Sequence, residues 1–431
     1  MKWKDYTYEI TDGRVCITGY DGDEAEISVP SQIKGCPVTS IGEGCFSGCG
    51  AAEITLPNTV KIIGECVFEL CVFLTKLNLN EGLEKIGSHA VRFTGLTELY
   101  IPSTVEFIGD LGEYGDLKIT VSERNLRFSS DGYSVFELGQ DFKILKIVNK
   151  NDNRKLYDIP LGTTEIGEGA FGGQPYLESL SLPDSVRSIG KNAFTDCFAH
   201  ISVSEGNPCF SADENALYGN DEKGRRLIKF FGSGDSFEIP ENIYFTEENA
   251  FLKSKLKRIA LPLNTVIGRN AFGECTEAET FIIKSGEEKI EIYVPRSPKY
   301  RKKDVCRLFY ENRDGCVFDF IGYDSLASSW EPLPERLKMA LCRLKSPFRL
   351  TEDKGEEYEN LINCSLDFLL RSICENEDTD TLADLNVLGF LSGDNISRAI
   401  ETAAQYGSPK ILSRMMDIRG ENRGEGFDFS L

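Results

Sequence analysis

A short phrase, Ile-Gly-x-x-Ala-Phe, recurs through the first two-thirds of this chain. It starts at positions 41, 63, 86, 166, 189 and 267, with some substitutions in the Ala and Phe slots. The isoleucines at 41, 63, 86 and 108 are 22, 23 and 22 residues apart. Periods of this length are typical of stacked-coil solenoids, in which each coil packs only on its neighbours. The phrase therefore predicts a repeat protein, which can reach 431 residues without one large core.

Each coil is expected to begin with a short strand and continue into a tight turn. In the third coil, Leu99 and Ile101 alternate with polar neighbours, as in a strand with one buried face. Pro102 ends the strand because it cannot donate to a sheet ladder. Ile108 then points inward, and Gly109 is predicted to supply a backbone angle that side chains resist. Stacking of such strands predicts a parallel sheet along one side of the solenoid.

Two intervals break the period. The spacing is 58 residues from Ile108 to Ile166 and 57 residues from Ile189 to Thr246. The additional segments resemble each other, reading NLRFSSDGYSVF from Asn125 and NPCFSADENALY from Asn207. Strand-forming residues flank Asp, Gly and Asn in both, which predicts two β-hairpin insertions, at about 125–160 and 207–240.

The phrases VPSQIKGCPVTSIGEGCFSGC from Val29 and SLPDSVRSIGKNAF from Ser181, with the two insertions, resemble the BspA-type leucine-rich repeat of bacterial proteins. The resemblance covers about residues 6–295. It implies a curved solenoid with short strands on the concave side and turns or 3₁₀ pieces elsewhere. It also implies a non-catalytic role, because members of the family are commonly surface or interaction proteins that bind other proteins. This chain differs from surface-exposed members in showing no secretion signal or wall-anchoring tail.

After about residue 296 the repeat phrase stops and apolar residues recur at helical spacing. Helices are predicted over 333–344, 358–373 and 396–406, the last capped by Asn395, and another from Pro409. Leucines at 382, 385 and 388 precede the apolar residues at 412, 415 and 418 by 30 residues each, an ankyrin-like spacing. The expected fold is thus a β-rich α/β leucine-rich repeat solenoid over 1–296, followed by a small all-α domain over 297–431. The basic run at 299–303 is expected to be a solvated linker at the boundary.

Charge and hydropathy exclude several classes of partner. The net charge is −21, and residues 297–431 carry 18 Lys and Arg against 24 Asp and Glu. Neither half is basic, so nucleic-acid binding is not expected. No apolar segment long enough to insert into a membrane occurs, and the first residues lack the apolar core of a signal peptide. These observations favour a cytoplasmic protein, with the cell surface as the alternative if export uses a route not visible in the sequence.

Fourteen cysteines do not form a disulfide pattern. Cys49, Cys71, Cys197 and Cys275 each lie three residues after the Phe position, where Thr94, Gln174 or Ser254 stand in other coils. A position that accepts all these residues is a packing slot, which predicts free thiols in a reducing compartment. A disulfide between Cys49 and Cys71 and a zinc site at Cys45, Cys49, Cys66 and Cys71 are the alternatives, and we predict neither a metal nor a cofactor.

No catalytic constellation is recognisable. The two histidines, His89 and His200, lack an identifiable nucleophile and orienting partner, and no phosphate-binding loop or hydrolase motif occurs. The sequence therefore predicts a non-enzymatic recognition or scaffolding protein, monomeric, with a protein partner that the sequence does not name. A structural spacer presenting the helical domain is the main alternative, and a surface adhesin is another.

The predicted binding surface is formed by the outward residues of the strands, because strand alternation places every second side chain on one face. These residues are Glu53, Thr55, Lys76, Asn78, Glu98, Tyr100, Lys118, Thr120, Ser179, Ser181, His200, Ser202 and Arg258. Tyr100 is the best single anchor, since large amphipathic rings often dominate interfaces.

Overall fold

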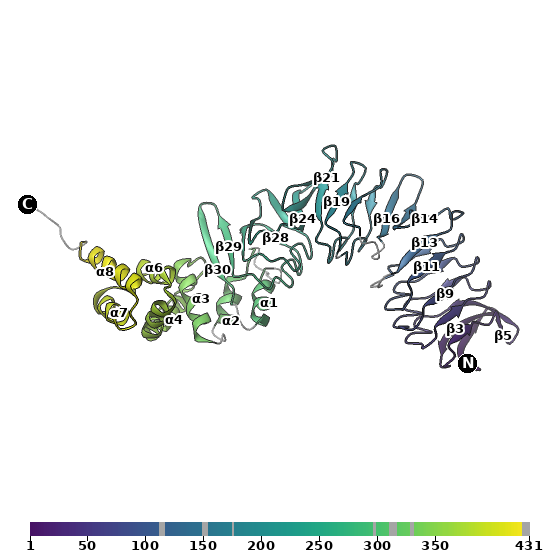
Figure 1. Ribbon diagram of the computed structural model, residues 1–431, viewed down its shortest axis with the longest axis horizontal. Coiled ribbons are helices and arrows are strands. Elements are labelled where there is room, and N and C mark those ends of the chain that lie inside the picture. The colour runs from purple at the N-terminus through teal and green to yellow at the C-terminus, as the bar shows by residue number, and fades with distance from the viewer. Residues whose placement is uncertain are drawn as a thin grey trace, which may run out of the picture. The chain divides into compact units, whose positions relative to one another are not determined.

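A computed structural model describes residues 1–111, 117–148, 154–174, 176–295, 299–309, 317–327 and 332–424 (Figure 1). The chain divides into two compact units, and one boundary in the sequence falls within strand β24 (Gly224–Phe230). Unit 1 comprises residues 1–222 and 227–232, and unit 2 comprises residues 223–226 and 233–431. The last coils therefore share a unit with the helices. The expected change of domain at 296 stays a prediction.

The leucine strands of unit 1 confirm the predicted parallel pairing, but they form three sheets instead of one. These sheets are β4 (Glu26–Ser28), β7 (Glu53–Thr55) and β9 (Lys76–Asn78); β11 (Glu98–Ile101) and β13 (Lys118–Val121); and β17 (Leu156–Asp158), β19 (Ser179–Leu182) and β21 (His200–Val203). The inward residues Ile54, Leu99 and Leu180 are each no more than 2% exposed. Burial of these side chains stabilises the stack, at about 25 cal/mol per Å² of apolar surface.

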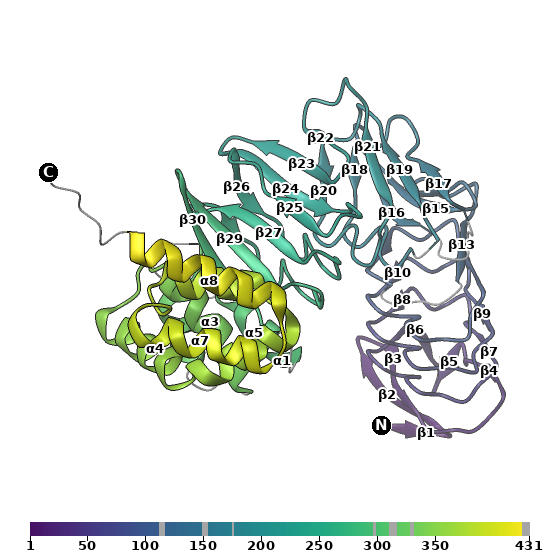
Figure 2. The same cartoon turned by 60° about the vertical axis from the view of Figure 1, so that its left-hand side comes forward.

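A second column of short strands occupies the isoleucine positions, where the sequence predicted only turns. Its first sheet pairs β1 (Lys2–Trp3), β2 (Tyr6–Thr11), β3 (Arg14–Tyr20), β6 (Cys36–Ile41), β8 (Ile62–Ile63), β10 (Lys85–Ile86) and β12 (Phe107–Ile108), with β5 (Gln32–Ile33) beside β6. The column continues with β18 (Glu165–Ile166) and β20 (Ser188–Ile189). In Figure 2, β3, β6, β8 and β10 follow one another along one side, with β7 and β9 opposite.

The glycine of the phrase serves a purpose other than the predicted one. Gly64, Gly109 and Gly190 have ordinary backbone angles, so the expectation of a special angle at Gly109 is wrong. Instead, the Gly190 N–H donates to Ile166 O, 2.7 Å away in the preceding coil. A Cβ on Gly190 would lie 2.6 Å from the backbone N of Glu168. Glycine is required because the coils approach too closely for any side chain.

The Phe position forms a column of buried rings beside the isoleucine strands. The centroids of Phe46 and Phe68 are 5.7 Å apart, and those of Phe171 and Phe194 are 5.5 Å apart. Both distances lie in the range in which stacked rings attract beyond their burial. A backbone bond of 2.8 Å from Phe171 N to Ala193 O holds successive coils in register beneath these rings.

The first insertion contains more than the expected hairpin. Strands β14 (Phe128–Ser130), β15 (Ser134–Leu138) and β16 (Lys143–Val148) run antiparallel in sequence, and β16 then pairs parallel with β18. The insertion therefore supplies a strand to the isoleucine column. The second insertion begins with the hairpin of β22 (Phe210–Ala212) and β23 (Ala216–Asp221). Residues 149–153 of the first insertion lie outside the described residues.

One asparagine fixes the start of each insertion. Asn125 donates its amide to Pro102 O at 2.8 Å and Val105 O at 3.0 Å, and its Oδ1 accepts from the N–H groups of residues 127 and 128. Asn207 repeats these contacts with Pro183 O, Val186 O and the N–H groups of residues 209 and 210. The same four bonds at both sites support the sequence inference that the interruption is itself repeated.

Unit 2 contains further coils and a final hairpin. Its leucine strands are β25 (Ser236–Glu238), β27 (Arg258–Pro262) and β29 (Thr280–Ser285), which run parallel, and β30 (Glu288–Tyr293) turns back antiparallel to β29. Its isoleucine strands include β26 (Ile243–Thr246) and β28 (Val266–Ile267). The reversal at β30 ends the repeat.

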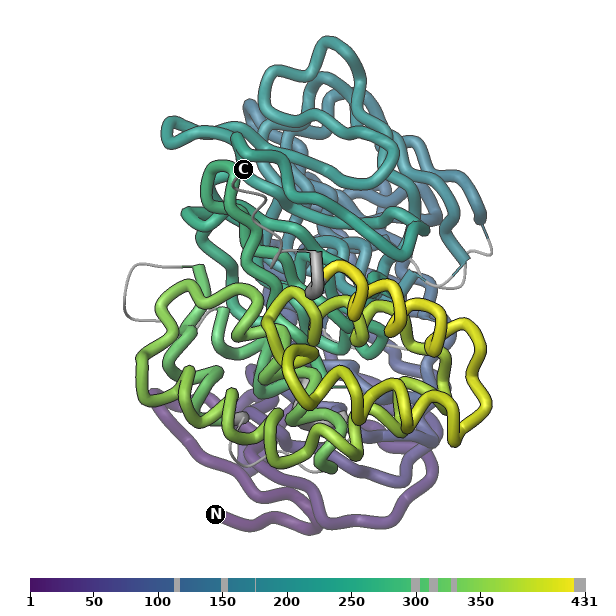
Figure 3. Tube along the Cα trace, turned by 90° about the vertical axis from the view of Figure 1, so that its left-hand side faces the viewer, coloured from purple at the N-terminus to yellow at the C-terminus, as the bar shows by residue number. Residues whose placement is uncertain are grey.

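Helices complete unit 2, and Figure 3 shows them in light green and yellow. They are α1 (Lys299–Arg307), α2 (Phe320–Ala327), α3 (Leu333–Lys345), α4 (Glu352–Cys364), α5 (Leu366–Asn376), α6 (Thr379–Val387), α7 (Gly393–Gln405) and α8 (Pro409–Gly424). The helices predicted from 333 and from Pro409 are confirmed. The ankyrin-like arrangement stays a prediction.

Three expectations about this region are wrong. The basic run expected as a linker forms α1. The segment 358–373 belongs to two helices joined at Ser365. The spacing of apolar residues does not reveal this break, because helical spacing continues after Ser365. Asn395 does not cap α7, because the helix begins at Gly393 after Ser392. The side-chain amide of Asn395 instead donates to Phe390 O at 3.0 Å.

The helices pack directly on the last strand of the repeat, with α3 against β30 (Figure 1). The Tyr323 hydroxyl donates to Tyr293 O at 2.7 Å, and the Tyr293 hydroxyl donates to Glu335 at 2.8 Å. The column of rings also continues into the helical region, because Phe309 lies 4.5 Å from Phe281 and 4.7 Å from Phe318 between centroids. The helical region thus covers the end of the coils and extends their core.

A buried ion pair joins three helices. Arg343, wholly buried on α3, donates from Nε and Nη2 to the two Asp324 oxygens of α2 at 2.8 and 2.9 Å. The Tyr358 hydroxyl of α4 adds a third bond to Asp324 at 2.9 Å. Two further guanidinium N–H groups donate to Ser346 O at 2.9 Å and Phe348 O at 3.2 Å. Every charge is satisfied, the condition under which a buried pair fixes one arrangement of helices.

Candidate functional surface

All thirteen residues predicted for the binding surface face outward and are exposed or half-buried. Twelve belong to unit 1, and Arg258 belongs to unit 2. We call the twelve unit 1 residues the strand face. Their strands pair in register, Glu53 with Lys76, Glu98 with Lys118 and Ser179 with His200. The register sets equivalent side chains of adjacent coils side by side at the usual strand spacing of about 4.8 Å.

The first sheet of the strand face carries a small polar network. Lys76 Nζ lies 2.9 Å from Glu53 Oε1, and the Asn78 amide donates to Glu53 at 2.6 Å and to Thr55 Oγ1 at 2.9 Å. Hydrogen bonds from Lys76 and Asn78 lower the pKa of Glu53. Because the network is exposed, its bonds are labile and can exchange for bonds to a partner.

Tyr100 is the largest side chain of the strand face and is 51% exposed. Tyr100 pairs in register with Thr120, and Glu98 pairs in register with Lys118. The tyrosine ring is therefore close in the sheet to one acidic and one basic side chain. An amphipathic ring on a rigid strand loses little conformational freedom on binding, and such residues are enriched among interface hot spots.

The third sheet carries hydroxyl and imidazole groups. Ser181 Oγ donates to Asp158 Oδ1 at 2.5 Å, Ser202 pairs in register with Ser181, and the His200 ring meets Phe231 edge-on at 5.0 Å. Asp158 is a surface residue that the sequence analysis missed, although its place in the period two residues after Leu156 would have revealed it. Within the described part of this sheet, His200 makes no hydrogen bond to either serine. Serine activation by histidine is therefore not seen in this sheet.

Arg258 is separate from the other predicted residues. It lies on β27, and its guanidinium is 3.7 Å from the Glu291 carboxylate of β30. This contact belongs to the closing hairpin of unit 2.

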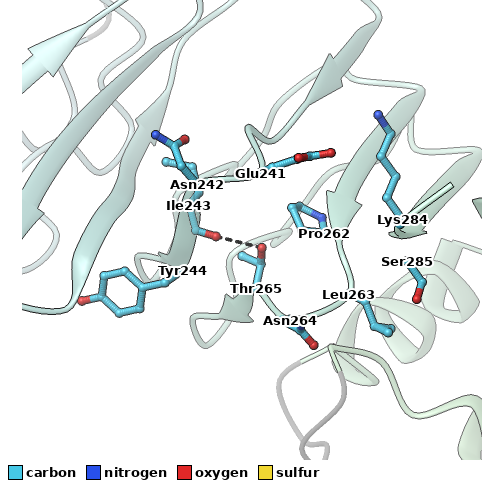
Figure 4. A pocket seen from close by; sticks show the side chains of 11 residues that line it. Glu241, Asn242, Ile243, Tyr244, Pro262, Leu263, Asn264, Thr265, Lys284 and Ser285 are labelled. Atoms are coloured by element: carbon cyan, nitrogen blue, oxygen red, sulfur yellow. Dashed lines mark hydrogen bonds between the residues drawn. The ribbon is translucent and has the colours of Figure 1, made fainter.

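A shallow pocket of about 400 Å³ in unit 2 was not anticipated (Figure 4). It opens where the column of Pro-containing turns ends, between the turns at 240–244 and 262–265 and the β29–β30 turn. Thr265 Oγ1 donates to Ile243 O at 2.9 Å across its floor. The Lys284 ammonium at its rim is paired with Glu238. The pocket arises because β30 replaces the next turn of the stack, a change of direction that no local pattern specifies.

The repeated cysteine slot is a packing site. The Cys71 thiol donates to Phe46 O at 2.9 Å, and the Cys275 thiol donates to Phe251 O at 3.0 Å. Burial raises the pKa of Cys71 to about 11 and raises that of Cys197. Thirteen cysteines are free in the part of the chain that the structure describes. Such buried thiols are poor nucleophiles at neutral pH.

Within the same described ranges, no group of three or more His, Cys, Asp or Glu residues is placed to hold a metal ion. His89 has a left-handed backbone, and its Nδ1 is buried. None of the helices that the structure describes has the length and apolar character needed to cross a bilayer.

Paired columns of leucine and isoleucine strands, with stacked rings at the Phe position of most coils, define a leucine-rich repeat solenoid. The model of the BspA type leucine rich repeat region matches six copies, in residues 25–112, 148–223 and 229–297. These ranges include more than half of the chain. The chain therefore belongs to the BspA-type leucine-rich repeat family, whose fold is generally non-enzymatic. None of the curated proteins matches this sequence.

Several bacterial leucine-rich repeat structures are similar to it. A leucine rich cell surface protein from Faecalibacterium prausnitzii is 20% identical, with 67% of this chain and 95% of that one covered and a TM-score of 0.39. The pneumococcal vaccine antigen PcpA is 21% identical, with 65% and 69% covered and a TM-score of 0.37. A leucine-rich repeat protein from Eubacterium ventriosum is 18% identical, with 66% and 92% covered and a TM-score of 0.39.

Proposed function

We propose that this protein is a non-enzymatic recognition protein that binds a protein partner through the strand face. The supporting observation is that twelve polar or aromatic side chains project from paired strands of one unit while the core is built from their neighbours. A surface whose residue types are not set by packing is free to match a partner. Tyr100 with Glu98 is the proposed centre.

Site-specific crosslinking in the source cell tests this proposal. A photoreactive phenylalanine analogue replaces Tyr100, and a control chain carries it at Tyr176, which is 60% exposed. We expect a covalent protein adduct from position 100 that is absent from position 176. Adducts from position 176 alone, or the same adducts from both, would contradict the strand-face assignment.

The rival function is a structural spacer that presents the helical region. Direct packing of α3 on β30 favours it, because the helices contact the last strand of the coils. Tyr100→Ala with Glu98→Ala separates the two functions. If the protein is a recognition protein, the double variant should lose its biological activity. If the protein is a spacer, the variant should keep it, since neither side chain is buried.

We place the protein in a reducing compartment, the cytoplasm, as a monomer. The thiols in the core slot support this assignment because they pack and hydrogen-bond as free groups. Titration of the denatured, reductant-free protein should find close to fourteen thiols, the number in the sequence. About ten or fewer would instead favour export to an oxidising environment, and sedimentation equilibrium tests the monomer.

A further inference from the structure

Two residues are apolar at a position where the other described coils carry glycine or a polar residue. Seven residues after the first residue of the phrase the backbone is left-handed, with φ of 69° at Gly48 and 66° at Gly173, and Asp196, Lys253 and Glu274 stand at the same position with φ of 53–59°. Glycine suits this conformation, because side chains on L-residues crowd the backbone there. Leu70 and Phe93 occupy the same position with φ of 62° and 56°. Large apolar residues at strained exposed positions call for a reason outside the fold.

These residues form the centre of an exposed apolar patch on two adjacent coils. We define the apolar patch as Leu70, Val72, Phe73 and Phe93, which are 52%, 59%, 67% and 39% exposed. The coils lie side by side here, because Leu70 N donates to Arg92 O at 3.0 Å. The apolar patch is therefore continuous across the two coils.

The core does not require the apolar patch. The inward positions beneath it are filled by Phe68, Cys71 and Leu74, which are fully buried. The path from Ile63 to Leu77 is also one residue longer than that from Ile86 to Leu99. The longer path accommodates both Val72 and Phe73 between the Cys71 slot and Leu74, and both side chains point to solvent.

Carboxylates lie on the same stack of coils as the apolar patch. Gly44 N donates to Glu65 O at 3.0 Å, which sets Glu65 beside Glu43 of the preceding coil, and Glu69 directly precedes Leu70. We call these three residues the acidic rim. Arg92 Nη1 lies 3.3 Å from Glu69 and its guanidinium covers the Phe93 ring at 4.5 Å. Among the described residues Glu43 and Glu65 form no salt bridge, and Arg92 pairs only with Glu69, so the rim keeps a negative balance.

We propose that the apolar patch and the acidic rim together bind an amphipathic protein segment whose apolar side chains are interspersed with Lys or Arg. Apolar burial supplies the driving force, and the rim selects against neutral and acidic segments. A second copy of this chain is a poor occupant, because it would bring two acidic rims together on a protein of net charge −21. This surface is distinct from the strand face, so its test is independent of the proposed function.

Three synthetic peptides of equal length test the proposal by fluorescence anisotropy with the full chain. One is an amphipathic Leu/Lys helix, one is its Leu/Glu counterpart, and one is a Ser/Lys peptide with the same charge but no apolar residues. We expect the Leu/Lys peptide to bind at least tenfold more tightly than either of the others. Equal binding of the Ser/Lys peptide would mean attraction by charge alone, and equal binding of the Leu/Glu peptide would mean that the rim is inert. Either result overturns the proposal.

Variants then locate the site. Leu70→Gly with Phe93→Gly removes two members of the apolar patch while giving the left-handed backbone the residue it favours, so the melting temperature should hold or rise. The Leu/Lys peptide should bind this variant at least tenfold more weakly. Leu126→Ser and Leu161→Ser, at side chains 92% and 81% exposed elsewhere in unit 1, are matched controls and should bind as the wild type does.

Two results would overturn this location. Unchanged binding by the glycine variant places the peptide elsewhere, and an equal loss in the leucine controls shows adsorption to any exposed apolar side chain. Phe73→Ser provides a second variant if the glycine variant fails to fold, because Phe73 has an ordinary backbone angle and lies outside the core. Glu43→Gln with Glu65→Gln should weaken Leu/Lys binding and reduce its salt dependence.

Discussion

The coils of unit 1 and the helices of unit 2 reach stability in different ways. Each coil repeats the same few contacts to its neighbour, such as the bond from Gly190 N to Ile166 O and the stacking of Phe171 on Phe194. The helices depend on one unrepeated cluster, in which Arg343 on α3 and Tyr358 on α4 meet Asp324 on α2. Repetition distributes stability over many equal contacts, whereas the helical region concentrates it.

Removing the helices should have the largest effect. Without residues 297–431, the β30 surface that α3 covers becomes exposed, along with the Phe281 ring that stacks on Phe309. We expect residues 1–296 to lose cooperative unfolding of the coils in unit 2 and to bind a hydrophobic dye, because an uncapped repeat end exposes its core. Calorimetry and dye fluorescence measure this. A truncated chain that is monomeric and melts as the full chain does would instead support an independent domain ending at 296.

Arg343→Met should destabilise the helical region by about 3–5 kcal/mol, because it leaves the Asp324 carboxylate buried and unpaired. Hydrogen exchange should show lost protection in α2, α3 and α4, with little change in the coils of residues 1–222. The double variant Arg343→Met with Asp324→Leu should recover much of the loss, since neither charge then remains. A single variant within about 0.5 kcal/mol of the wild type would mean that the ion pair does not concentrate stability as argued.

Gly190→Ala should have a smaller effect of about 1–3 kcal/mol, because its Cβ would press on the backbone of Glu168. Hydrogen exchange should confine the loss to the coils on either side of residue 190. Gly50→Ala is the matched control, since a Cβ there meets nothing within 4 Å and the backbone angle is ordinary. If both variants behave alike, close approach of the coils is not what selects glycine.

The smallest effect concerns pH and Glu53. Its folded-state pKa is lowered by hydrogen bonds from Lys76 and Asn78. A lowered pKa contributes stability that is present above the unfolded value of about 4.3 and disappears as pH falls through the folded value. Carboxyl NMR titration should find the pKa of Glu53 below the ordinary glutamate value, and Lys76→Ala should raise it toward that value. If the pKa of Glu53 is the same in the wild type and in Lys76→Ala, the network is not formed in solution.

The period of the sequence by itself determined the repeat, the inward leucines and the outward strand residues, because strand alternation and burial are local properties of each coil. It also identified the helices that begin near 333 and at Pro409 from their apolar spacing and prolines. The same patterns located the repeated insertions, and Asn125 and Asn207 make equivalent bonds at both.

Tertiary structure alone decided the remaining features. The isoleucine strands exist only because the neighbouring coil supplies their hydrogen-bond partners. Glycine is required in the phrase because the backbones of neighbouring coils approach closely there. The break at Ser365, the pairing of Arg343 with Asp324 and the pocket beside β30 each depend on residues distant in sequence. Likewise, the strain at Leu70 and Phe93 becomes visible only when their backbone angles are compared along the column. A local pattern records which side chains a segment buries, but not which other segment will meet them.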